Sequence, residues 1–146
     1  MHWIIFALIT VCLGQPEDNR KGKDHALFFA VTNYDEWADL RNPIRDAEAI
    51  AKVLQEDFDF STEVVHNPTK EEILIKINNY LTRKYEDDNQ LMIFFTGHGE
   101  FNSLSRIGYF IPKDGKKTLD DPFHQSHLSL NDLKVIINSI NCKHNL

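Results

Sequence analysis

The 146-residue chain is poor in cysteine, in basic residues and in glycine, and each shortage excludes a class of protein. Its two cysteines are too few for a disulfide framework or a zinc ribbon, so a hydrophobic core has to provide the stability. Lys and Arg number 16 against 22 Asp and Glu, and the resulting charge of −6 argues against nucleic acid or an anionic membrane surface as partner. Six glycines exclude a collagen-like chain. These limits leave one soluble domain.

The longest apolar run lies at the N-terminus, over residues 3–13, and is shorter than the ~20 residues that a membrane span needs. It predicts a signal peptide over residues 1–14, followed by a polar linker over 15–24 and a domain over 25–146. A lipoprotein signal with Cys12 lipidated is a weaker alternative, because Val11 is bulky for that position. Another alternative is that this apolar run is a buried first strand or helix of the fold. We therefore expect an exported protein, secreted or periplasmic, with no membrane span.

The rest of the chain alternates strand and helix signals. Residues 25–32 and 91–96 are apolar throughout, as in strands covered on both faces, and 61–65 and 106–111 are shorter strand candidates. Helical spacing of apolar residues and start signals predict three helices, which begin after Asn42, Thr69 and Ser129. The predicted fold is α/β, with a mostly parallel sheet and helices on both faces. Ligands bind such sheets beyond the carboxyl ends of the strands, here at the predicted loops over residues 33–40 and 97–105.

Gly97-His98-Gly99 follows the third predicted strand directly. A histidine fixed there can act as a general base or acid near neutral pH, and flanking glycines let the backbone approach a substrate. The Gly99 amide could stabilise an oxyanion. The alternative is a tight turn in which His98 only makes local hydrogen bonds.

The other polar groups are weaker candidates for a functional site than His98. Asp35, with neighbouring acidic residues, forms either a solvated loop or a wall that attracts a cationic side chain. His124 and His127 lie near Asp120 and Asp121, but their spacing matches no compact metal motif, so a polar loop is the better interpretation. No glycine-rich phosphate loop is present in the sequence. We therefore predict no metal and no other cofactor.

Four segments resemble, in this order, the N-terminal half of a caspase-like domain, with the greatest similarity to metacaspases and bacterial caspase-like proteins. They are FFAVTNYDEWADLRNPIRDAEAIAKVL, LMIFFTGHGE, RIGYFIPKDG and LSLNDLKVIINSINCKHNL. Leu40-Arg41 followed by Asp46-Ala47 also matches the family pattern, and the resemblance covers about residues 25–146.

The resemblance implies a three-layer caspase-like fold and a cysteine endopeptidase that acts on peptides or proteins. His98 would be the histidine of a Cys-His dyad, and the Gly99 amide one arm of its oxyanion hole. Thr96 would lie near the pocket for the side chain before the scissile bond. Asp35 would suit a basic side chain there, whereas Arg41 lies near the arginine by which caspases select aspartate but is also usual in metacaspases. The preference therefore stays open.

The family nucleophile follows a further strand, which would begin here at about residue 145. Cys142 precedes that strand and is expected to be a buried, inert thiol at the opposite edge of the sheet. We therefore expect half a dyad: a chain truncated before its nucleophile, inactive alone, marginally stable, and with the missing C-terminal half as a candidate partner. The alternatives are a non-catalytic module that binds a peptide or partner, and an unrelated doubly wound domain with an incidental turn.

Overall fold

The structure is a computed structural model, and it describes residues 22–142 and 144–145. The predicted signal peptide and Cys12 lie outside the described residues. The elements are, in chain order, β1 (His25–Ala30), α1 (Pro43–Phe58), β2 (Ser61–His66), α2 (Lys70–Leu81), β3 (Gln90–Thr96), β4 (Gly99–Asn102), β5 (Ile107–Phe110), β6 (Leu128–Ser129), α3 (Leu130–Asn138) and β7 (His144–Asn145).

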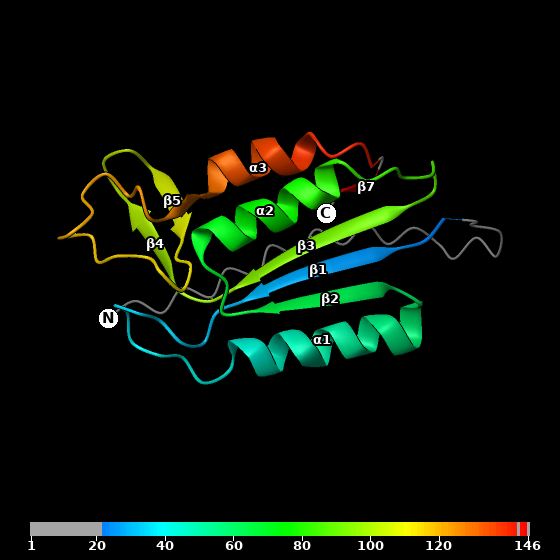
Figure 1. The fold of residues 1–146 in the computed structure, drawn as a ribbon, viewed down its shortest axis with the longest axis horizontal. Coiled ribbons are helices and arrows are strands. Elements are labelled where there is room, and N and C mark those ends of the chain that lie inside the picture. The colour runs from blue at the N-terminus through cyan, green and yellow to red at the C-terminus, as the bar shows by residue number, and fades with distance from the viewer. Residues whose placement is uncertain (1–21, 143, 146) are drawn as a thin grey trace.

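The central sheet has the strand order β2-β1-β3-β7, and all its neighbours run parallel. Figure 1 shows α1 on one face of this sheet and α2 with α3 on the other. From Ala26 to Ala30 every residue of β1 is fully buried, because the strand lies inside the sheet and is covered on both faces. The predicted α/β class, with a parallel sheet between two helical layers, is therefore confirmed.

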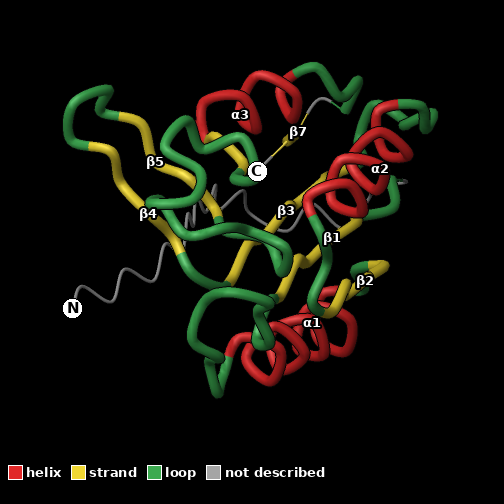
Figure 2. The backbone as a smooth tube through the Cα atoms, turned by 60° about the vertical axis from the view of Figure 1, so that its left-hand side comes forward, coloured by secondary structure: helices red, strands yellow, loops and turns green. Residues whose placement is uncertain are grey.

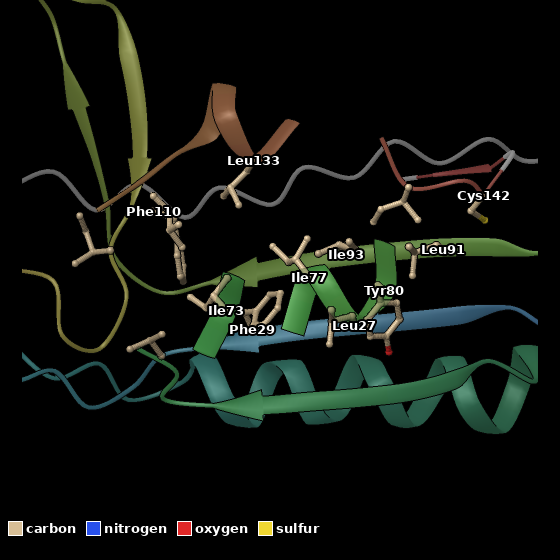
Figure 3. Close-up of a cluster of buried hydrophobic side chains, with 14 of the residues drawn as sticks. Leu27, Phe29, Ile73, Ile77, Tyr80, Leu91, Ile93, Phe110, Leu133 and Cys142 are labelled. Carbon is tan, nitrogen blue, oxygen red and sulfur yellow. The ribbon is translucent and has the colours of Figure 1, made fainter. Parts of the chain in front are cut away.

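Two apolar cores flank the sheet. The larger core joins the sheet to α2 and α3 through residues such as Phe29, Ile77 and Leu133 (Figure 3). The smaller core packs Phe28 against Ala47 and Ala51 of α1. The spacing of apolar residues also places Ile50 on the buried face of α1, but its side chain is exposed, whereas Ala47 and Ala51 are buried in the core.

The helix starts follow the sequence signals to different degrees. Thr69 and Glu72 form the predicted capping box of α2. At α3 the Ser129 hydroxyl accepts the Asp132 amide at 3.3 Å, which is one half of such a box. Asn42 occupies the N-cap position of α1 before Pro43, but its side chain makes no capping hydrogen bond.

A second, antiparallel sheet of order β4-β5-β6 lies beside the carboxyl end of β3 (Figure 2). The prediction of a loop over 97–105 is wrong for residues 99–102, which form β4 and pair with β5. Their sequence, Gly-Glu-Phe-Asn, is too short and too polar to carry an alternating pattern. The connecting turn is closed by Asn102 Oδ1, which accepts the amides of Leu104 and Ser105.

The segment predicted as a linker meets the fold at its last residues. The Lys23 amide donates to Asn89 Oδ1 at 2.8 Å, and Asp24 Oδ1 accepts the amide of Gln90 at 3.1 Å. These bonds attach the chain to the amino end of β3. Over the part of the chain that the structure describes, no helix combines the length and the apolar character that a membrane crossing requires.

Candidate active site

His98 lies in the short turn between β3 and β4, at the carboxyl end of the central sheet. The segment after β1, residues 33–40, starts at the same edge because β1 and β3 are adjacent and parallel. The two segments meet at this edge, because the carbonyl oxygen of Ala38 lies within hydrogen-bond distance of the His98 ring.

The His98 ring is held by three residues of the segment after β1. Its Nε2 atom lies 2.8 Å from the carbonyl oxygen of Ala38, and its ring centroid lies 4.8 Å from that of Tyr34 and 5.5 Å from that of Trp37. A carbonyl oxygen only accepts hydrogen bonds, so Nε2 must carry the proton. In the neutral imidazole Nδ1 is then the atom with a free lone pair, and therefore the proton acceptor.

Tyr34 fixes the backbone of the same turn. Its buried hydroxyl accepts the His98 amide at 2.7 Å. Burial raises the pKa of the Tyr34 hydroxyl well above its ordinary value, against a smaller lowering by this hydrogen bond, so the phenol stays neutral. A Cβ atom added at Gly97 would lie 2.5 Å from the Tyr34 hydroxyl, so only glycine allows this close approach.

The Ala38 carbonyl is positioned by a closed loop. Asp39 Oδ1 accepts the amide of Tyr34 at 2.9 Å, and the Leu40 amide donates to the Thr32 carbonyl at 2.8 Å. The Asp35 amide also donates to the carbonyl of Lys113, which attaches the loop to the segment after β5. The partner of His98 is thus a backbone atom in a pinned loop.

The Gly99 amide is left outside the β4–β5 ladder. The Ile111 amide donates to the His98 carbonyl at 3.0 Å, so His98 and Ile111 form a hydrogen-bonded pair. Gly99 and Phe110 are the next pair, and pairs alternate in an antiparallel ladder. The Gly99 N–H therefore points away from β5, as is required of an amide that donates a hydrogen bond to an oxyanion.

Within the described residues, the other predicted site residues make no hydrogen bond or ring contact with the His98 imidazole. Thr96 ends β3, and its carbonyl accepts the amide of Val31 at 2.9 Å. The exposed Asp35 carboxylate lies 3.9 Å from the Lys113 ammonium, so a cation already neighbours it. Arg41 is exposed just before α1. The contacts to the His98 ring come instead from Tyr34, Trp37 and Ala38, as given above.

These three contact residues were not singled out by the sequence. Tyr34 and Trp37 carry a weak signal, because two aromatic residues follow a buried strand closely where polar residues are usual. Ala38 acts through its carbonyl group, which every residue has, so its identity carries no signal.

Cys142 lies at the other end of β3. Its buried Sγ donates to the carbonyl of Asn89 at 3.2 Å, next to the amino end of the strand, whereas His98 follows the carboxyl end. Seven strand residues span ~20 Å, so this thiol cannot exchange a proton with His98. Cys142 is the only cysteine among the described residues, and it is buried, as predicted.

The geometry combines an oriented imidazole, an amide one residue later that points away from β5, and a sheet edge where strands end. Such a group of residues can move protons and stabilise an oxyanion, as acyl transfer requires. No curated relative matches the chain in sequence. The family model of the caspase domain matches residues 23–145, a range that contains both sheets and the His98 turn. The chain therefore belongs to the caspase domain family.

Proposed function

We propose that this chain supplies the histidine half of a cysteine endopeptidase site, in which His98 is the general base and acid. One observation carries the proposal: the hydrogen bond from His98 Nε2 to the Ala38 carbonyl, at 2.8 Å, which leaves Nδ1 as the basic atom. Membership of the caspase domain family supports the same chemistry.

The proposed reaction uses His98 twice. Nδ1 takes the proton of a cysteine thiol, and the thiolate attacks the scissile carbonyl carbon of a bound peptide. The Gly99 amide donates to the oxyanion that forms. The imidazolium then protonates the leaving amine nitrogen, and an acyl-enzyme remains. In the second half His98 takes a proton from water, which attacks the acyl carbon and releases the carboxylic acid and the thiol.

The thiol in this proposal comes from outside the described residues, since Cys142 is at the wrong end of β3. β7 pairs only with Gln90 and Leu91, so within the described residues the edge of β3 beyond Leu91 has no neighbouring strand on that side. A parallel strand that continued in the register of β7 would end at the level of Thr96. Its next residues would then meet the turn that holds His98, which is where a nucleophile is needed.

Peptide binding is proposed to involve Thr96, Asp35 and Arg41 near the side chain that precedes the scissile bond. Asp35 and Arg41 are exposed and carry opposite charges. Charge-removing variants of each, assayed with both an arginyl and an aspartyl reporter peptide, distinguish their roles. A residue that selects the substrate changes the ratio of kcat/KM between the two peptides, whereas a structural residue lowers both equally.

The proposal is tested with the chain alone and with the chain joined through β7 to the C-terminal half of another caspase domain. The chain alone should not hydrolyse either reporter, and the joined polypeptide should. His98→Ala should lower kcat/KM at least about a hundredfold. His66→Ala is the matched control, because His66 ends the neighbouring strand β2, is exposed and lies outside the site.

Unchanged hydrolysis in the His98→Ala variant contradicts the proposed role. Reporter binding by the joined polypeptide, without turnover, supports the other candidate, a non-catalytic peptide-binding module. His98-dependent turnover by the 146-residue chain alone contradicts the proposed external source of the thiol, but not the role of the histidine.

A further inference from the structure

Glu100, His124 and His127 bring three ligand atoms together beside the antiparallel sheet. Glu100 lies on β4, two residues after His98, and the histidines lie in the segment that leads to β6. The Nδ1 atoms of the histidines are 3.0 Å apart, and each is 3.7 Å from Glu100 Oε2. The side chains of His124 and His127 are 4% and 0% exposed, and that of Glu100 is 24% exposed.

The Glu100 carboxylate is held by one oxygen and left unsatisfied at the other. The Thr118 hydroxyl donates to Oε1 at 2.5 Å. Oε2 is buried and has no hydrogen-bond partner. A buried carboxylate oxygen without a partner is costly, so its position between two imidazoles calls for a cation.

His127 is already oriented as a ligand. Its Nε2 atom lies 2.8 Å from the carbonyl oxygen of Lys116, so Nε2 carries the proton and Nδ1 has the free lone pair. A hydrogen bond from the distal nitrogen to a carbonyl oxygen is the usual outer contact of a metal-bound histidine.

His124 has the opposite tautomer when no metal is bound. Asn102 Oδ1 accepts two backbone amides, so its Nδ2 group, a donor, faces His124 Nε2 at 3.3 Å. Nε2 therefore accepts, and the proton of His124 lies on Nδ1, directed at His127 Nδ1. A bound metal would replace this hydrogen bond, and the proton of His124 would move to Nε2.

We propose that Glu100, His124 and His127 form a binding site for a divalent metal ion of the zinc class. Two imidazole nitrogens and one carboxylate oxygen are a donor set that zinc takes when a fourth position stays open. Tetrahedral zinc places its ligand atoms ~3.3 Å apart, and the three observed separations lie on either side of this value. A surface cavity of about 300 Å³ is lined in part by His124 and His127.

The site would join two parts of the chain that meet near His98. The Lys116 carbonyl that holds His127 also accepts the Trp37 indole N–H at 3.2 Å, and Trp37 packs on His98. A metal bound by Glu100, His124 and His127 would therefore link β4 to the segment between β5 and β6, which contacts Trp37 beside His98. Binding of the metal does not depend on peptidase activity, so it is tested separately.

The test is titration of the tag-free, metal-free chain with Zn²⁺, followed by calorimetry and thermal unfolding, and with Co²⁺, followed by its visible absorption. We expect one saturable site per chain, a higher Tm with Zn²⁺ and tetrahedral Co²⁺ bands. Glu100→Gln keeps the shape and the Thr118 contact but should weaken binding more than tenfold and remove the metal-dependent rise in Tm. His66→Ala should bind like the wild type.

Asn102→Asp gives a second, opposite test. A carboxylate at this position would accept a hydrogen bond from the protonated Nε2 of a metal-bound His124 and would still cap the turn. The metal should therefore bind about tenfold more tightly. Failure of the wild type to bind saturably, or equal binding by wild type and Glu100→Gln, overturns the proposal. The same holds for a cluster that takes up only a proton, whose Tm would respond to pH and not to Zn²⁺.

Discussion

The Tyr34 hydroxyl holds the backbone of His98 most directly, because its oxygen accepts a hydrogen bond from the His98 amide. Tyr34→Phe removes this acceptor and is expected to lower the free energy of unfolding by about 1 kcal/mol. Urea unfolding measures the change. Tyr85→Phe is the control, since it too removes a tyrosine hydroxyl that makes a hydrogen bond, in this case as the donor to the Tyr80 carbonyl. Both variants should lose stability, and only Tyr34→Phe should impair hydrolysis by the joined polypeptide.

Gly97 makes the approach of Tyr34 sterically allowed. Gly97→Ala would place a methyl group 2.5 Å from the Tyr34 hydroxyl, so the turn or the phenol must move, at a cost of about 1–3 kcal/mol. Gly108→Ala is the comparison, because its added atom meets only the flexible end of Leu130 at 3.0 Å. Equal stability of the two variants in urea would show that the contact at Gly97 is not tight.

The sequence singled out His98 and Gly99 as candidates because a histidine between two glycines directly follows a buried strand, although a simple tight turn would show the same residues. It did not identify Ala38, because a backbone carbonyl leaves no trace in residue type. Nor did it join Glu100 to His124 and His127, because Glu100 lies far from the two histidines in the chain and reaches them through the fold, in which β4 pairs with β5.

Among the elements, the segment between β5 and β6 depends most on one carboxylate. Asp121 is buried and accepts the amides of Gln125 and Ser126 and the Ser126 hydroxyl. Burial alone would raise the pKa of Asp121, but these hydrogen bonds outweigh it and lower the pKa to about 2, from an ordinary 3.8.

Because the pKa of Asp121 is lower in the folded chain, its stabilising effect is complete above pH 3.8 and is lost as the pH falls toward about 2. The urea midpoint should therefore fall across this window, and Asp121→Asn should reduce that dependence. Asp120→Asn, at the exposed neighbouring position, should keep the wild-type profile. An unchanged profile in Asp121→Asn would mean that the carboxylate does not hold the segment.

Elements were predictable where a periodic pattern met a start signal. Thr69 with Glu72 fixed the beginning of α2, and the apolar runs fixed β1 and β3. β4 escaped because its strand pairing is imposed by β5, and its own four residues include a glycine and an asparagine.

Over the whole molecule, the parallel sheet places the ends of β1 and β3 together, and that arrangement makes the site. Fold class follows from alternation of strands and helices along the chain, so it could be predicted. The edge of β3 beyond Leu91 has no strand beside it within residues 22–142 and 144–145. An unpaired inner edge favours association with a further strand.

The open edge of β3 predicts that the association state of the chain depends on its concentration. The 146-residue chain alone should unfold with low stability or self-associate, and joining a strand that continues β7 should raise Tm and give a monomer. Sedimentation and urea unfolding measure both properties. A cooperative transition of the separate chain with an m-value normal for its length, together with a monomeric state, would contradict this expectation.

The most direct test of the central claim is the ¹⁵N chemical shifts of the two His98 ring nitrogens in the neutral state, assigned by comparison with His98→Ala. The hydrogen bond to the Ala38 carbonyl predicts a protonated Nε2 and an unprotonated Nδ1. A ring protonated on Nδ1 would show that this imidazole is not held as the base of a peptidase site.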